Sequence, residues 1–178
     1  ETGVDGFRLD AIKHINRNFI KELVADIRGN GRPDFFVVGE YWKNDYGTIQ
    51  DYLEATEFSI DLFDVTLHYN LHQASKAGAD YDLRQIFKDA LINKDPVNAV
   101  TFVDNHDSQP GQSLESYVEP WFKLLAYAII LLRREGFPCL FYGDYYGIGG
   151  ENPIEPFTDS LNKLLYLRSN HAYGEQQD

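Results

Sequence analysis

The stretch Phe35-Phe-Val-Val-Gly39, followed at once by Glu40-Tyr-Trp42, shows the pattern that decides the fold. A short apolar run that ends at a glycine and a charged residue is typical of a strand buried on both faces of a parallel sheet. Four further runs of this kind occur: Val4–Leu9, Ile60–Val65, Ala99–Val103 and Pro138–Tyr142. Their starts lie about 25 to 40 residues apart, which is the size of a strand–helix unit.

Segments with helical periodicity connect these runs. Asn16–Arg28 carries its apolar residues on one stripe and is followed by Gly29, which favours a helix end. Three more helices are expected over Tyr81–Ile92 with Asp82 as the cap, over Trp121–Arg134 after Pro120, and from about Thr158 to Arg168. Alternating strands and helices predict an α/β fold.

Two closures suit such a chain: a doubly wound open sheet or a (β/α)8 barrel. No glycine-rich phosphate loop follows any strand, which disfavours a nucleotide-binding sheet. Acidic and histidine side chains instead follow three strand ends, where barrel enzymes place their chemistry. Because a whole barrel has eight strands, the five runs predict a partial (β/α)8 TIM barrel, about strands 4 to 8 with their helices. Residues 1–178 are then the C-terminal portion of a barrel catalytic domain.

Composition narrows the possible partners. The chain has 16 Lys and Arg against 28 Asp and Glu, a formal charge of −12, so nucleic acid and anionic membranes are not expected as partners. With 43% hydrophobic residues the chain can form a core. Its longest apolar run, Trp121–Leu132, includes Lys123 and is too short to span a bilayer. The lone Cys139 lies in an apolar run and is expected to be a buried structural thiol.

The first chemical motif is Gly6-Phe-Arg-Leu-Asp10. Residues two apart in a strand share a face, so Arg8 and Asp10 are expected to lie together. A guanidinium beside a carboxylate keeps it ionised, which suits a nucleophile. A purely structural ion pair is the alternative.

The second motif is Val37-Val-Gly-Glu40-Tyr-Trp42. Desolvation favours the protonated form of a carboxyl, so Glu40 at the end of an apolar strand suits a general acid. The alternative is an ordinary surface glutamate. Tyr41 and Trp42 either stack on a ligand or cover the end of the barrel.

The third motif, Phe102-Val-Asp-Asn-His-Asp107, places two acids, an amide and an imidazole directly after a strand. A capped turn explains one of these residues but hardly all four. Asp107 is expected to face the site, with His106 as a hydrogen-bond donor. Two carboxyls suffice for a retaining glycosidase, and a third can stabilise its cationic transition state.

These three motifs, with Lys13-His14 extending the first, resemble signature regions of the alpha-amylase family of glycoside hydrolases. Phe63–Tyr69, Thr101–Glu115 and Phe141–Gly147 are similar to segments of its bacterial liquefying members and their intracellular relatives. The resemblance covers essentially the whole chain and implies a retaining hydrolase that cleaves internal α-1,4-glucosidic bonds of starch-like or glycogen-like glucans.

The resemblance also implies a role for each matching residue. Asp10 matches the nucleophile, Glu40 the general acid/base and Asp107 the transition-state stabiliser. Arg8 matches the arginine that orients the nucleophile, and His106 a histidine that binds the sugar. The leaving-group side is matched by Lys13, His14 and Trp42. The family commonly binds Ca²⁺, for which His14 matches a backbone-carbonyl ligand; the alternative for His14 is a helix N-terminal histidine with a satisfied side chain.

The chain departs from the family in what it lacks. The first signature region, the inserted domain with most calcium ligands and the C-terminal β-sandwich are absent, and Ser108 stands where threonine is usual. We therefore expect the isolated chain to be inactive. A maltooligosaccharide-forming amylase, a glucan-transferring relative and a non-catalytic binding module are the alternative functions. A monomer is expected, and Glu135–Tyr142 resembles the intracellular branch, which slightly favours a cytoplasmic over a secreted location.

Overall fold

The computed structural model describes residues 3–176. It forms one five-stranded parallel sheet in the order β1-β2-β3-β4-β5, so each strand lies beside its neighbour in the sequence. The strands are β1 (Gly6–Leu9), β2 (Phe36–Gly39), β3 (Asp61–Phe63), β4 (Ala99–Phe102) and β5 (Phe137–Cys139). This sequential parallel order is that of a barrel segment and confirms the predicted partial (β/α)8 barrel.

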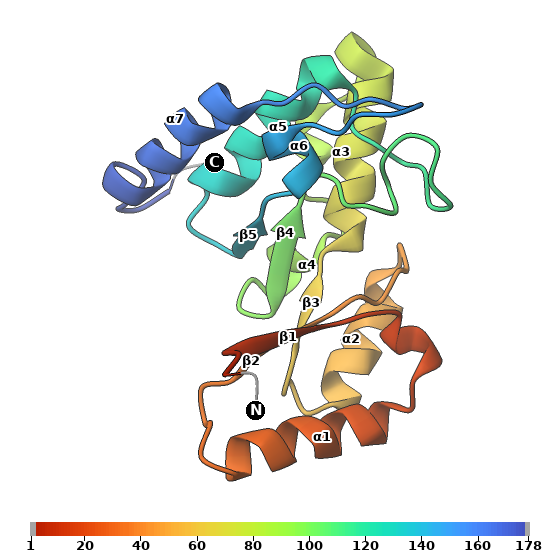
Figure 1. Cartoon of the computed structure of the whole chain (residues 1–178), viewed down its shortest axis with the longest axis vertical. Helices are drawn as coiled ribbons and strands as arrows, with labels where there is room; N and C mark the ends of the chain where they lie inside the picture. The colour runs from red at the N-terminus through yellow and green to blue at the C-terminus, as the bar shows by residue number, and fades with distance from the viewer. Residues whose placement is uncertain (1–2, 177–178) are drawn as a thin grey trace.

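Helices connect successive strands, as Figure 1 shows. They are α1 (Arg17–Gly29), α2 (Tyr46–Ala55), α3 (Val65–Ala77), α4 (Leu91–Lys94), α5 (Pro120–Leu132), α6 (Tyr142–Tyr146) and α7 (Thr158–Asn170), with short 3₁₀ turns at Ile12–His14, Gly78–Asp80 and Leu83–Gln85. α1 and α2 lie beside β1 and β2, while α3, α5, α6 and α7 gather around β4 and β5 (Figure 1).

Local sequence signals explain several helix ends. The Asn16 side chain accepts the Asn18 N–H and caps α1, and Asp45 and Asp64 cap α2 and α3 in the same way. Pro120 occupies the first turn of α5, where its missing N–H costs nothing. The helices expected over Asn16–Arg28, Trp121–Arg134 and Thr158–Arg168 are confirmed within two residues at each end.

The prediction of a helix over Tyr81–Ile92 is wrong. That segment forms only a 3₁₀ turn and the start of the short α4. The Asn70 amide donates to the carbonyls of Ile86 and Lys88, and Asp89 adopts a φ of 54°. These tertiary hydrogen bonds and the left-handed residue replace helical bonding that the local apolar pattern favoured.

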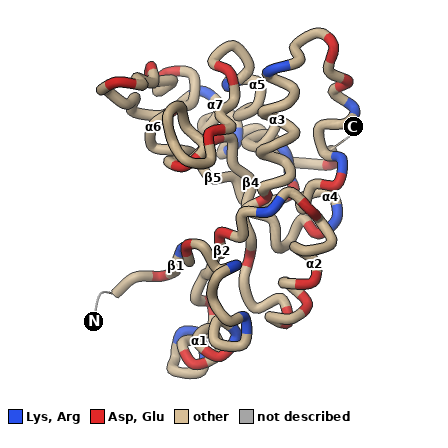
Figure 2. The backbone as a smooth tube through the Cα atoms, turned by 90° about the vertical axis from the view of Figure 1, so that its right-hand side faces the viewer, with Lys and Arg blue, Asp and Glu red and all other residues tan. Residues whose placement is uncertain are grey.

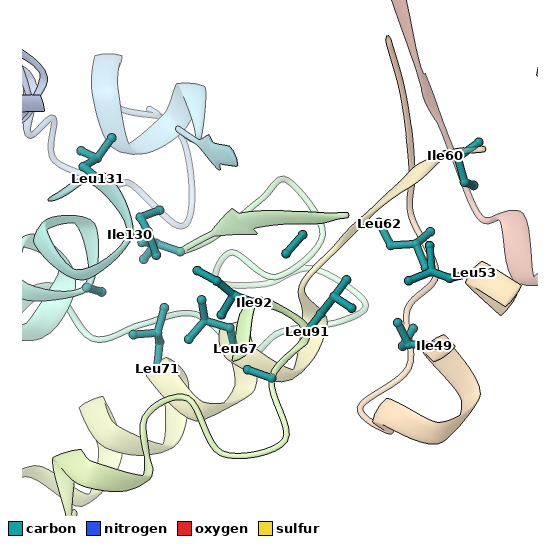
Figure 3. Packing of buried hydrophobic residues seen from close by; sticks show 14 of the residues in the cluster. Ile49, Leu53, Ile60, Leu62, Leu67, Leu71, Leu91, Ile92, Ile130 and Leu131 are labelled. Carbon is teal, nitrogen blue, oxygen red and sulfur yellow. The ribbon is translucent and has the colours of Figure 1, made fainter. Parts of the chain in front are cut away.

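The two faces of the sheet differ. One face packs its apolar side chains, including Val37, Leu62 and Ala99, against the helices. Figure 3 shows Leu67 and Leu71 of α3 lying near Leu91 and Ile92, and Ile49 and Leu53 of α2 lying near Leu62. At about 25 cal/mol per Å² of apolar surface, burial in this layer is the main source of stability.

The opposite face is more open. The strand register and the alternation of side chains place Arg8, Val38, Phe63, Val100 and Phe137 on this side. The rings of Phe36 and Phe137 lie 6.4 Å apart although β2 and β5 are not neighbours, so the sheet curves and this face is concave. Phe36 is 42% and Phe137 50% exposed, which departs from the expectation of strands buried on both faces.

Charge is spread over the whole molecule. Figure 2 shows acidic residues in both groups of helices and mixed charges along α1. No helix within residues 3–176 is long and apolar enough to cross a bilayer.

Candidate active site

One guanidinium links two of the three expected carboxylates. Arg8 Nη1 lies 2.9 Å from Asp10 Oδ1, and Arg8 Nη2 lies 3.8 Å from Glu40 Oε2. Asp10 follows β1 and Glu40 follows β2, which are adjacent parallel strands. Their carboxyl ends therefore meet at one sheet edge, and Arg8 places both acids around a single cation.

Backbone geometry fixes this pair. Ala11 has a φ of 48°, an unusual conformation for a residue with a side chain, and its N–H donates to Glu40 Oε2 at 3.1 Å. Ile12 N–H donates to the Glu40 carbonyl, and Glu40 N–H donates to the Leu9 carbonyl. The chain after Asp10 is thus folded back onto Glu40, and the strained residue lies directly beside the expected nucleophile.

Gly39 makes this close approach possible. A Cβ at Gly39 would lie 2.4 Å from the Ile12 side chain and 3.1 Å from that of Leu62. Ile12 is fully buried there and anchors the turn that follows Asp10. The absence of a side chain at Gly39, the last residue of β2, therefore lets the turn after Asp10 pack against this strand.

The two acids differ in solvent contact. The side chain of Asp10 is 66% exposed, whereas that of Glu40 is 7% exposed. Asp10 is open to a ligand and close to the cation, whereas Glu40 is buried at the end of its apolar strand.

The loop after β4 holds the third acid. Asp107 is partly exposed, and its Oδ2 lies 3.3 Å from Nε2 of the exposed His106. Asn105 Oδ1 accepts the N–H groups of Asp107 and Ser108, so the turn is capped as one reading of the motif expected. Within the described chain Asp107 makes no ion pair or hydrogen bond with Arg8, Asp10 or Glu40; only the shared sheet edge relates them.

The residues expected on the leaving-group side follow β1, for Lys13 and His14, and β2, for Trp42. Lys13 and His14 are exposed, and Lys13 Nζ lies 3.5 Å from the Trp42 carbonyl. Trp42 is only 7% exposed, and its Nε1 donates to the Tyr69 hydroxyl. This burial favours the second reading of Trp42, a cover for the end of the barrel, over a platform for a sugar.

Cys139, expected to be buried, is only partly buried on the concave face, where it packs against the buried cluster of Trp42, Val65 and Phe102. Burial raises the pKa of its thiol, and the charge of Arg8 opposes this. A thiol held protonated in this way is a poor nucleophile, consistent with a structural role.

Sequence reasoning missed several buried polar residues beneath the site. His68 of α3 is fully buried, and its ring stacks on Phe102 at 5.0 Å. Its Nδ1 lies 2.6 Å from the Val103 carbonyl and must donate, so Nε2, 2.8 Å from Ser116 Oγ, is free of a proton in the neutral ring. Burial lowers the pKa of His68 to about 4, so the ring is neutral near pH 7.

A pH dependence of stability follows. Because the pKa of His68 is about 4 in the folded state and 6.5 when exposed, the unfolded chain binds more protons between these values. Stability should therefore fall as pH drops from about 6.5 to about 4, by on the order of 3 kcal/mol from this residue. Asp104, whose Oδ1 lies 4.0 Å from His68 Nδ1, and nearby His72 face the same ring.

The pH dependence is measured by urea unfolding at pH 7.5 and 4.5 of the wild-type protein and of a His68→Gln variant. The variant should be less stable at pH 7.5 but lose less stability on acidification. Asp104, whose raised pKa acts in the opposite direction, is common to both proteins. Equal losses in the two proteins would contradict the assignment.

The described residues offer few ligands for Ca²⁺. Ca²⁺ takes about 6–8 oxygen ligands, whereas within residues 3–176 no group of three or more His, Cys, Asp or Glu side chains is placed to hold a metal ion. His14 offers a backbone carbonyl at the end of a 3₁₀ turn. The described residues thus fit at most an edge of such a site.

Sequential parallel strands with acids at their carboxyl ends place the chain in the class of (β/α)8-barrel enzymes. Residues 1–172 match the family model described as the alpha-amylase catalytic domain, and the chain belongs to the alpha-amylase family of glycoside hydrolases.

Curated relatives agree with this membership. The chain is 48% identical to an alpha-amylase of Bacillus licheniformis over 180 residues, which cover 100% of this chain and 35% of that protein. It is also 48% identical to a glucan 1,4-alpha-maltohexaosidase of Bacillus sp. strain 707, over 99% of this chain and 34% of that protein. The chain therefore spans about a third of the length of these relatives.

A solved structure has the same fold. An alpha-amylase from Geobacillus thermoleovorans, complexed with acarbose, superposes with a TM-score of 0.69 at 26% identity, over 94% of this chain and 40% of that one. The five-stranded sheet corresponds to part of its barrel.

Proposed function

We propose that residues 1–178 are the C-terminal portion of the catalytic barrel of an alpha-amylase that hydrolyses internal α-1,4-glucosidic bonds with retention of anomeric configuration. The observation that carries this proposal is the contact of one guanidinium, that of Arg8, with both Asp10 and Glu40 at adjacent strand ends. A retaining glycosidase needs such a close pair of carboxyls, one nucleophilic and one proton-donating.

The surroundings of the two carboxyls support these two roles. Arg8 lies nearer to Asp10 than to Glu40, and the Asp10 side chain is the more exposed of the two. An exposed carboxylate held at one oxygen by a guanidinium can reach an anomeric carbon, which suits a nucleophile. Glu40, at the end of the adjacent strand, is held through Oε2 by the Ala11 N–H and supplies the second carboxyl, which a retaining glycosidase needs as its general acid/base.

The reaction then takes two steps. In the first, Asp10 forms a bond to the anomeric carbon while the bond to the leaving oxygen breaks and Glu40 gives that oxygen its proton. In the second, Glu40 takes a proton from water, whose oxygen displaces Asp10 and releases the product. Asp107 stabilises the positive charge that develops at the ring in both transition states.

The remaining residues support binding. Arg8 orients Asp10, and His106, exposed beside Asp107, donates to a sugar hydroxyl. Lys13 and His14 lie open to solvent on the leaving-group side, where Trp42 covers the strand end and anchors Lys13 through its carbonyl. When Ca²⁺ is bound, the carbonyl of His14 would be one of its ligands and the ion would brace the turn after Asp10. The partner is a glucan chain bound by a monomer.

A maltooligosaccharide-forming amylase is the second candidate. The relative named as a maltohexaosidase is as similar to this chain as the B. licheniformis alpha-amylase. A non-catalytic binding module is disfavoured because all three acids are present.

Digestion of amylose tests the proposal. The complete protein that carries this chain should release oligosaccharides whose new reducing ends are α-anomers, as observed by NMR within the first minutes. Chromatography should show a range of lengths for an alpha-amylase and one dominant hexamer for the second candidate. The 178-residue chain alone should release no reducing sugar, because within residues 3–176 the outer edges of β1 and β5 have no neighbouring strand. Release of β-anomers, or activity of the isolated chain, would contradict the account.

A further inference from the structure

Three charged side chains are buried together beneath the site. Lys123 of α5 lies between Asp104, in the loop after β4, and Asp144 of α6. Lys123 Nζ is 3.0 Å from Asp104 Oδ2 and pairs also with Asp144. Both aspartate side chains are fully buried, and the lysine side chain is 4% exposed. The Tyr127 hydroxyl, one helical turn from Lys123, donates to Asp144 Oδ2 at 2.7 Å.

The lysine is charged in this setting. Burial alone would lower the pKa of Lys123, but the two carboxylates raise it above its ordinary value. Burial, reinforced by the like charge of Asp144, raises the pKa of Asp104 to about 7 although Lys123 opposes this. A lone ammonium thus binds two acids that have no access to water.

A continuous series of hydrogen bonds leads from this cluster to Asp107. Asp104 Oδ1 accepts the Ser108 hydroxyl proton at 3.1 Å, and Ser108 Oγ accepts the Asn105 N–H at 3.0 Å. Asn105 Oδ1 in turn accepts the Asp107 N–H at 2.9 Å. Asp104 also accepts the Val118 N–H, which ties the end of the same loop. Every link from Lys123 to the backbone of Asp107 is a direct polar contact.

We propose that Lys123 is a positioning residue that sets the place of Asp107 and His106 by anchoring their loop through Asp104, Ser108 and Asn105. The inference rests on the proposed function, since it assumes that Asp107 acts on the reacting sugar. Lys123 joins the loop after β4 to α6, which follows β5, so the third acid is held relative to two neighbouring strands and not to one loop alone.

Energetics favour such a role over a simple contribution to the core. Burying an ion pair costs desolvation, and well-packed apolar residues often stabilise a core equally well. A paired buried charge instead fixes a single geometry, because any other arrangement leaves a charge without a partner. A loop that must hold a carboxylate opposite two others benefits from that constraint.

Four variants of the complete protein test the proposal. Ser108→Ala removes the hydroxyl that bonds to Asp104 and to the Asn105 N–H, and it leaves no buried charge unpaired. Ser108→Thr keeps the hydroxyl. Lys123→Met removes the anchoring charge. Thr56→Val removes an equally buried hydroxyl, which donates to the Tyr52 carbonyl on α2, away from the loop. Each variant is assayed for thermal unfolding and for kcat and KM on amylose and on α-maltotriosyl fluoride, whose leaving group needs no proton donor.

Ser108→Ala and Lys123→Met should lower kcat by about 10- to 100-fold on both substrates with little change in KM, because a displaced Asp107 weakens the transition state whatever the leaving group. Ser108→Thr should restore most of kcat. Thr56→Val should lower the unfolding temperature but not kcat.

An unchanged kcat for folded Ser108→Ala would overturn the proposal even if Lys123→Met fails to fold. A loss seen on amylose but absent on the fluoride would overturn it too, because that pattern belongs to Glu40. If the wild-type protein is active on both substrates and Ser108→Ala is unaffected, the proposal for Lys123 fails but the proposed function is retained. If the wild-type protein is inactive, the proposed function and the proposal for Lys123 both fail.

Discussion

Replacing Asp10 by asparagine in the complete protein should lower kcat on amylose by on the order of 10⁴-fold or more, the size of loss seen when a covalent nucleophile is removed. The amide cannot attack the anomeric carbon, and it removes the anion that pairs with Arg8 Nη1 at 2.9 Å. Reducing-sugar release under saturating substrate measures the effect.

Stability should change little in this variant. The Asp10 side chain is 66% exposed, so its loss leaves no buried group without a partner. Asp5→Asn is the matched control, because Asp5 is also exposed and lies just before the same strand. Activity of Asp10→Asn within tenfold of the wild-type protein would remove Asp10 from the role of nucleophile.

Replacing Glu40 by glutamine should lower kcat on amylose by about 10²- to 10⁴-fold, because the leaving oxygen loses its proton donor. On α-maltotriosyl fluoride the first step should be largely spared, since fluoride departs without a proton. The intermediate should then accumulate and give a burst, because no base activates water for the second step.

The glutamine should leave the fold intact. Its oxygen can still accept the Ala11 N–H that Glu40 Oε2 accepts. Glu22→Gln on the exposed side of α1 is the control and should keep full activity. Equal losses on both substrates would show that Glu40 does not act as the acid.

The sequence predicted the three acidic strand ends because each lies directly after an apolar run. Period-two alternation placed Arg8 and Asp10 on one face, and the ion pair between them is present. Alternation could not show that the same guanidinium reaches Glu40, because this depends on the register of β1 and β2 and on the turn at Ala11. The burial of Trp42 under Tyr69 depends in the same way on a distant helix.

One feature of the buried cluster could be predicted from the sequence. Lys123 is a charge inside the apolar run Trp121–Leu132, and such a lysine needs an acidic partner when buried. Its partners Asp104 and Asp144 come from the loop after β4 and from α6, so only the folded structure identifies them. The wrong prediction of a helix over Tyr81–Ile92 has a similar cause, since Asn70 of α3 donates hydrogen bonds to this segment that no local sequence pattern reveals.

The most direct test of the account identifies the residue that carries the sugar during turnover. Glu40→Gln protein is mixed with α-maltotriosyl fluoride, quenched in acid within the burst, digested and examined by mass spectrometry. The account predicts a maltotriosyl group on the peptide that contains Asp10, with fragmentation placing it on that side chain. A label on another residue, or a burst that leaves no covalent adduct, would contradict it.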